Sequence, residues 1–138
     1  MKRVVSLIIV AVLIIGLAIP AFAATDAGTQ PRYTYIQYAN TQITIDQSTG
    51  TATCNGHIAA KISVPVAVQV KLQVKKNGVW QTLATRVANN VEQAIVSFQC
   101  KVEKGYEYKV VTNAYAYNEQ GTLVESTVVT DFAYYPAS

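Results

Sequence analysis

Few residues in this chain have the chemistry that catalysis requires. His57 is the only histidine, and the alternating pattern around it predicts a side chain that points outward beside Asn55. A Ser-His-Asp arrangement would need Asp46 or Asp131, but no nucleophile-elbow sequence accompanies either residue. We therefore interpret His57 as a surface residue.

Carboxylates and metal ligands are equally sparse. Glu103 and Glu107 flank Gly105 and have the residue types of a glycosidase pair, but two charges beside a turn are typical of solvation. One His and two Cys leave too few ligands for a metal site. We expect no enzymatic activity, no metal and no cofactor.

The first 23 residues have the parts of a cleavable export signal. A short positive start (1–3) precedes an apolar run (4–19), a helix-breaking Pro20 and the A-x-A peptidase site 21–23. The alternative is a retained anchor helix, because the apolar run is nearly long enough to span a bilayer. We expect cleavage after Ala23, a secreted product with no membrane association, and a flexible leader over 24–31.

Removal of this signal also changes the charge. The formal net charge of +3 includes Lys2 and Arg3, and the signal holds no acidic residue. The remaining chain is nearly neutral and lacks the basic stripe that phosphate binding requires. Nucleic acid is therefore excluded as an expected partner.

The remaining chain has a hydrophobic period of two, which predicts an all-β fold. In the clearest run, apolar residues at 66, 68, 70, 72 and 74 alternate with mostly polar ones. Short turns separate seven predicted strand segments: 33–45 (one or two strands), 51–62, 66–75, 80–87, 93–102, 106–117 and 123–135. We predict one antiparallel β-sandwich domain over 32–138, preceded by the signal helix.

Two cysteines follow this pattern. Cys54 and Cys100 both fall on the predicted inward faces of their strands, one near the start and the other near the end. Antiparallel pairing of the two strands would bring them together, and an even number of cysteines in an exported chain indicates a disulfide. The alternative is two buried free thiols. We predict a Cys54–Cys100 bridge.

A hairpin at Asn77-Gly78 sets the position of the only tryptophan. Asn-Gly between two strand patterns predicts a type I′ turn, because both central residues need positive φ. A regular hairpin makes three cross-strand pairs: Lys76 with Val79, Lys75 with Trp80, and Leu72 with Leu83. The leucine pair would lie in the core, and Trp80 would lie on the solvated face with Lys75.

Aromatic residues are the candidate ligand contacts. An outward Trp80 on the stem of Lys75 would make a cation–π contact and offer a flat platform to a sugar or a protein. Alternatively, a bulge turns Trp80 inward to pack at the edge of the sandwich. Tyr115 and Tyr117 are also expected to point outward. The candidate contacts are Trp80, Lys75, Tyr115 and Tyr117.

Two resemblances bear on the fold and the compartment. The segment GYEYKV (105–110), which opens a late strand after a turn, resembles the tyrosine corner of immunoglobulin-like and fibronectin-type sandwiches. There a Tyr stands two residues before an inward residue, which is Val110 here. The resemblance implies an immunoglobulin-like sandwich. Because the second Cys comes one strand early and Trp80 follows a hairpin, it implies a same-sheet bridge rather than the inter-sheet disulfide of antibody domains.

The chain also resembles a group of uncharacterised small exported proteins of Gram-positive bacteria. The similarity lies in the signal and in five short segments: RYTYI (32–36), GTATCNG (50–56), VKKNGVW (74–80), GYEYKV (105–110) and VES (124–126). It implies export and a β-sandwich fold.

The expected function is that of an exported, non-enzymatic β-sandwich that acts as a binding or structural module at the cell surface or in the medium. Cell-wall polysaccharide and another surface protein are the expected classes of partner. The alternative is a secreted bacteriocin-like effector or an accessory protein of a hydrolase.

Overall fold

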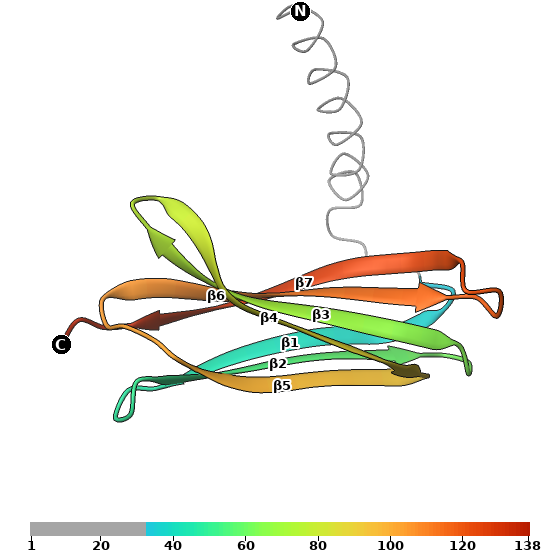
Figure 1. Ribbon diagram of the computed structural model, residues 1–138, viewed down its shortest axis with the longest axis horizontal. Coiled ribbons are helices and arrows are strands. Elements are labelled where there is room, and N and C mark those ends of the chain that lie inside the picture. Colours follow the sequence, from blue (N-terminus) through green and yellow to red (C-terminus); the bar gives the residue numbers. More distant parts are fainter. Residues whose placement is uncertain (1–32) are drawn as a thin grey trace, which may run out of the picture. The chain divides into compact units, whose positions relative to one another are not determined.

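Seven antiparallel strands form two stacked sheets in the computed structural model, which describes residues 33–138 (Figure 1). The strands are β1 (Ile36–Asp46), β2 (Thr51–Ala60), β3 (Pro65–Lys76), β4 (Val79–Val91), β5 (Gln93–Lys101), β6 (Tyr106–Tyr117) and β7 (Leu123–Tyr135). One sheet has the order β1-β2-β5 and the other β4-β3-β6-β7. This confirms the predicted all-β sandwich. The predicted signal (1–23) and leader (24–31) lie outside the described residues.

The core lies between the two sheets and is built by the alternation seen in the sequence. On β3, the five inward residues from Val66 to Val74 are each at most 1% exposed. Ile58 on β2 and Val110 on β6 are also fully buried. Each such side chain contributes about 1.5–3 kcal/mol through burial. Within residues 33–138, no helix is both long and apolar enough to cross a membrane.

The hairpin between β3 and β4 is partly as predicted. Asn77 and Gly78 have φ of 54° and 76°, and Lys75 pairs with Trp80 and Lys76 with Val79. The predicted Leu72–Leu83 pair is wrong, because a β-bulge shifts the register and places Leu72 opposite Ala84. Leu83 is consequently 45% exposed instead of buried in the core.

Strand β4 continues past its predicted end and reaches Val91, where one residue connects it to the other sheet. That residue, Glu92, has a φ of 73°, which is a left-handed conformation that favours glycine. Its backbone is held by Ala60, whose N–H donates to it (2.7 Å), and by Val64, whose carbonyl accepts from it (2.9 Å). These hydrogen bonds offset the strain of the abrupt crossover.

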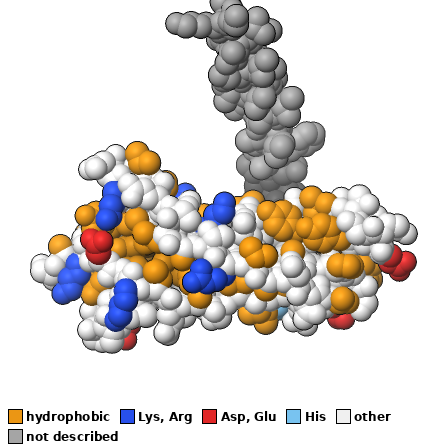
Figure 2. Space-filling view, in the orientation of Figure 1, with side chains coloured by type: hydrophobic (Ala, Val, Ile, Leu, Met, Phe, Trp, Pro, Cys, Tyr) orange, Lys and Arg blue, Asp and Glu red, His pale blue; other side chains and the backbone are white. Residues whose placement is uncertain are grey.

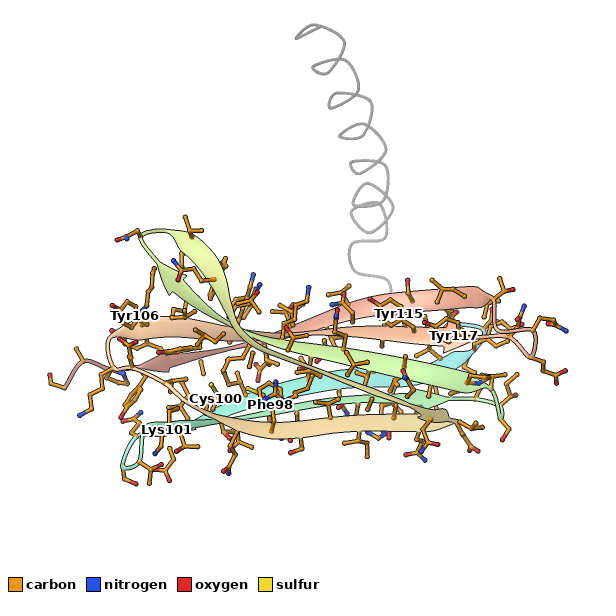
Figure 3. The ribbon with its side chains drawn as sticks, in the orientation of Figure 1. Phe98, Cys100, Lys101, Tyr106, Tyr115 and Tyr117 are labelled. Carbon is orange, nitrogen blue, oxygen red and sulfur yellow. The ribbon has the colours of Figure 1, made fainter. Side chains whose placement is uncertain are left out.

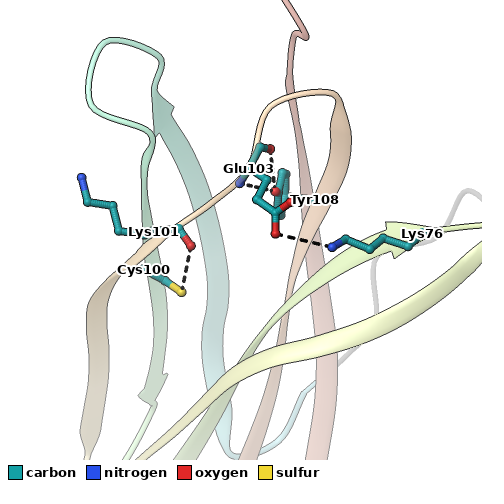
Figure 4. A network of polar contacts seen from close by, with 5 residues as sticks. All are labelled: Lys76, Cys100, Lys101, Glu103 and Tyr108. Carbon is teal, nitrogen blue, oxygen red and sulfur yellow. Dashed lines mark hydrogen bonds and ion pairs between the residues drawn. The ribbon is translucent and has the colours of Figure 1, made fainter.

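The tyrosine corner expected around Val110 is formed by Tyr108. Its buried hydroxyl donates to the carbonyl of Glu103 (2.7 Å) and accepts from the N–H of the same residue (2.8 Å; Figure 4). Burial raises the pKa of Tyr108. The Glu103 carboxylate also lies 3.5 Å from the Lys76 ammonium. The corner therefore fixes the β5–β6 turn to the end of the core.

Side chains from β7 cover the edge of β1. The Glu125 carboxylate accepts three backbone hydrogen bonds, from Thr34 (2.7 Å), Tyr35 (2.8 Å) and Ile36 (2.6 Å). Farther along, the Asp131 carboxylate accepts from the N–H of Ile43 (3.0 Å). These carboxylates satisfy donors that an uncovered edge would present to another chain. The two carboxylates therefore cover this edge at the start of β1 and again at Ile43.

Near its centre the sandwich holds a buried polar chain over a glycine. Thr112, which has no exposed surface, donates to the hydroxyl of Thr41 (2.7 Å), and Thr41 donates to the carbonyl of Asn55 (3.0 Å). Gly56 lies beneath this chain, where a Cβ would stand 2.7 Å from Thr112 Oγ1 and 2.3 Å from Val70 Cγ2. The absent side chain of Gly56 lets the two sheets approach at this point.

Candidate functional site

Trp80 lies on the outer face of the four-stranded sheet, at the end that carries the β3–β4 turn. The strand registers align it in one row with Lys75, Glu107 and Tyr134. The next row contains Thr82, Gln73, Lys109 and Phe132. Trp80 therefore shares the outer face with Lys75, as the hairpin geometry indicated, and its side chain is half-buried.

The indole ring contacts two lysines and a second aromatic ring. Lys109 Nζ lies 4.4 Å and Lys75 Nζ 5.8 Å from the ring centroid. The Phe132 ring is 6.2 Å away, tilted by 56°. Because β4 and β7 are separated by two strands, or about 14 Å, the indole must lean across β3 and β6 to reach Phe132. Its neighbours on this face account for its partial burial.

Three rings together form what we call the aromatic patch: Trp80, Phe132 and Tyr134. Phe132 and Tyr134 are 56% and 58% exposed, which is high for large rings on a sheet face. Lysine ammonium groups at Lys75 and Lys109 and the Glu107 carboxylate lie among them in the two rows. This arrangement combines apolar ring surface with polar groups, which suits stacking on a ligand together with hydrogen bonding. On the face seen in Figure 2, hydrophobic side chains are interspersed with lysines and arginines.

Tyr115 and Tyr117 do not join this patch. Both point outward on β6 and are half-buried, but they lie toward the opposite end of the domain from Tyr106 (Figure 3). Six residues along the strand separate Tyr115 from Lys109, a distance of about 20 Å. Of the four candidate contacts, Trp80 therefore belongs to the patch and Lys75 lies beside it. Tyr115 and Tyr117 lie far from it.

Sequence reasoning missed three members of this site: Phe132, Tyr134 and Lys109. The alternation in the last strand contained a usable signal, because Phe132 and Tyr134 fall on the face opposite the buried Tyr135. Their place beside Trp80, however, depends on the order of the strands, which alternation within a single strand does not reveal.

The cysteines are placed on neighbouring strands, as predicted, but without the bridge. Strands β2 and β5 pair with Cys54 opposite Phe98 and Cys100 opposite Ala52, so the two cysteines are offset by two residues. Both thiols are free. The predicted disulfide is not formed in this structure, where the register puts the two side chains in diagonal rather than facing positions. Burial, and to a lesser extent the nearby Cys100, raises the pKa of the Cys54 thiol to about 12, which keeps it protonated and unreactive.

His57 lies in a polar setting on β2. Its ring stands edge-on to Tyr38, whose hydroxyl is 3.4 Å from Nδ1, while Nε2 lies 3.2 Å from Gln93 Oε1. The Asp131 carboxylate accepts a hydrogen bond from the backbone of β1. The Asp46 carboxylate accepts hydrogen bonds from Ser48, and these lower the pKa of Asp46. Across the described part of the chain, no three His, Cys, Asp or Glu side chains are grouped to hold a metal ion.

Comparisons with known proteins found distant structural similarity to several solved structures. No protein-family model matches the chain, and no curated protein matches it. The sporulation control protein Spo0M from Bacillus subtilis is 12% identical over 72% of this chain, with a TM-score of 0.45, and the match covers 49% of Spo0M. The chain therefore spans about half the length of that protein.

Two further solved structures are similar at a TM-score of 0.39. The CARDB domain of a Pyrococcus furiosus protein, solved in complex with di-metal ions, is 18% identical, and the match covers 78% of this chain and 94% of that domain. A Bacteroides uniformis beta-glucuronidase is 13% identical over 70% of this chain and 13% of its own length.

Proposed function

We propose that this protein is an exported, non-enzymatic β-sandwich that binds polysaccharide at the cell surface or in the medium through the aromatic patch. The signal sequence supports export. The carrying observation for binding is the exposure of Phe132 and Tyr134 beside a tryptophan that is flanked by two lysines.

A polysaccharide suits this patch because each sugar ring has apolar C–H faces and a polar rim. The flat rings of Trp80, Phe132 and Tyr134 can cover the C–H face of a sugar and remove apolar surface from water. Lysine ammonium groups at Lys75 and Lys109 can donate hydrogen bonds to hydroxyl oxygens at the rim. Because several rings spread over the sheet, a chain of sugars gains more contacts than a single one.

We further propose an immunoglobulin-like arrangement of the sandwich. The tyrosine corner at Tyr108 supports it, as do the groupings of β1 with β2 and β5 and of β3 with β6 and β7. In constant-type immunoglobulin domains the fourth strand joins the sheet of the first two, whereas β4 here pairs with β3. This switch extends the outer face on which Trp80 lies.

The test is retention of the protein without its signal on insoluble cell-wall polysaccharide. Trp80→Ala and Phe132→Ala should each weaken binding by at least about 2 kcal/mol, close to thirtyfold, if the rings are the anchors. Tyr38→Ala is the matched control, because Tyr38 is an exposed ring (41%) on the other sheet. Circular dichroism of each variant establishes that the fold is retained.

Two results would contradict the proposal. Equal retention of the Trp80→Ala and Tyr38→Ala variants on the polysaccharide would show that the aromatic patch does not contribute to binding. No retention on any wall fraction, together with killing of neighbouring bacteria, would favour a bacteriocin-like effector. The fluorescence of Trp80 gives a direct readout, because it is the only tryptophan and its emission should shift to shorter wavelength when a sugar covers it.

A further inference from the structure

A hollow lies on the outer face of the three-stranded sheet. It has a volume of about 340 Å³ and is lined by Asp46, Thr49, Thr51, Thr53, Gln99 and Lys101. Figure 3 shows Lys101 at the end of the domain where β1 turns into β2. Every lining residue is polar, which sets this hollow apart from the aromatic patch on the other sheet.

The strand registers explain why these side chains converge. Thr51 on β2 pairs with Asp46 on one side and with Lys101 on the other, and Thr53 pairs with Gln99. The intervening Ala52 is buried in the core, so both rows point outward. Neighbouring strands are about 4.8 Å apart and the two rows about 7 Å, which matches the dimensions of one sugar ring.

Several hydrogen-bonding groups in the hollow are available to a ligand. Ser48 donates two hydrogen bonds to Asp46 Oδ1, from its backbone N–H (2.9 Å) and from its hydroxyl (2.6 Å). Thr49 also contributes hydrogen bonds to this carboxylate. The side chains of Thr51, Thr53 and Gln99 add two hydroxyl groups and one amide to the lining. Threonine hydroxyls donate and accept, and the amide does both at separate atoms.

The charge in the hollow balances. The Asp46 carboxylate and the Lys101 ammonium stand on opposite sides of Thr51, and Lys101 Nζ is already held by the carbonyl of Thr49 (2.9 Å). A site with one charge of each sign gains little from an ion of either sign. The absence of apolar side chains from its lining also disfavours an apolar ligand.

We infer that this hollow, the polar pocket, binds a neutral polyhydroxylated ligand of the size of a monosaccharide. Hydroxyl groups match it because each can donate to the Asp46 carboxylate or to the Gln99 carbonyl and accept from Lys101 or a threonine. The site lies on the opposite sheet from the aromatic patch and does not depend on the function proposed for that patch.

The experiment is a titration of the ¹⁵N-labelled protein with glucose and, separately, with N-acetylglucosamine, followed through its backbone amide signals. Shifts should concentrate at Thr51, Thr53 and Gln99 and saturate at millimolar sugar. Thr53→Val removes one hydroxyl but keeps the β-branched shape, so it should weaken binding about fivefold. Thr44→Val is the matched control, because Thr44 pairs with Thr53 on the same face but does not line the pocket, and it should leave binding unchanged.

Other outcomes overturn the inference. Saturating shifts with neither sugar would refute it, as would equal weakening by Thr53→Val and Thr44→Val. Shifts with glycine but not with glucose would assign the pocket to a zwitterion instead. Sugar-induced shifts confined to the surroundings of Trp80 would show that the sugar binds at the aromatic patch and not in the polar pocket, which would refute the inference. Conversely, Trp80→Ala should not change the shifts at Thr53.

Discussion

Replacing Gly56 with alanine tests the closest approach of the two sheets. The added Cβ would stand 2.3 Å from Val70 Cγ2 and 2.7 Å from Thr112 Oγ1. Ordinary carbon–carbon contacts are about 3.5–4.0 Å, so the first contact is more than 1 Å too short. Val70 and Thr112 have no exposed surface, and neither side chain can move into solvent.

The expected loss of stability follows from these two contacts. Overpacking a well-filled core costs about 1–3 kcal/mol, and the upper end applies where the neighbours cannot yield. Displacing Thr112 also breaks its hydrogen bond to Thr41, which adds about 1 kcal/mol. We expect Gly56→Ala to lower the free energy of unfolding by about 3–4 kcal/mol, which corresponds to a Tm lower by about 15 °C for a domain of this size.

The assay is urea unfolding of the domain, followed by circular dichroism and by Trp80 fluorescence. The compensating variant Gly56→Ala/Val70→Ala removes the methyl group that clashes. The free energy of unfolding lost in this double variant should be smaller than the sum of the losses in the two single variants by at least about 1 kcal/mol, because the two sites are in contact. A loss below about 0.5 kcal/mol for Gly56→Ala would refute the reasoning, because surface substitutions alone fall in that range.

Three further predictions concern the covered start of the β1 edge, the crossover at Glu92 and the thiols. Glu125→Ala should lower the free energy of unfolding by about 2–4 kcal/mol and promote aggregation, because three backbone donors lose a charged acceptor. Glu119→Ala, in the exposed β6–β7 turn, is the control. Equal effects of the two substitutions would contradict this prediction. Glu92→Gly should raise the free energy of unfolding by about 0.5–1 kcal/mol in the same urea assay, since glycine relieves the positive φ; a net loss would show that the side chain matters more. Because the folded pKa of Cys54 is raised from 9.0 to about 12, the stability it contributes is complete below pH 9 and is lost as the pH rises toward 12. Cys54→Ala should flatten the part of the decline in the free energy of unfolding that begins near pH 9. In the native protein, iodoacetamide should modify Cys100 before Cys54. The reverse order would contradict the burial of Cys54.

Alternation within single strands predicted much of the fold. The segment from Val66 to Val74 became β3 with its apolar side chains in the core, and the Asn77-Gly78 turn formed with both residues at positive φ. The tyrosine corner was also predictable, because Tyr108 and the backbone of Glu103 are only five residues apart. These features depend on neighbours in the sequence, so local pattern was sufficient to predict them.

Register and strand order were harder to predict, and the errors occurred there. The expected pairing of Leu72 with Leu83 failed because one extra residue in a bulge cannot be seen in an alternating pattern. The expected bridge between Cys54 and Cys100 is likewise not formed in the structure. The inward orientation of Cys54 and Cys100 was deduced correctly, and the register offset of two residues, which keeps both on the inner face, was not.

The sequence by itself determined that this chain is an all-β sandwich, since a period of two and an Asn-Gly turn act over a few residues, but it left both an outward and an inward Trp80 open. Only the tertiary structure decided what lies beside that tryptophan. Phe132 and Lys109 reach it from strands that are distant in the sequence, and the polar pocket combines residues from Asp46 to Lys101. The physical reason is that hydrogen bonding between strands sets which rows align, and this pairing reflects packing of the whole core rather than the preference of any one segment.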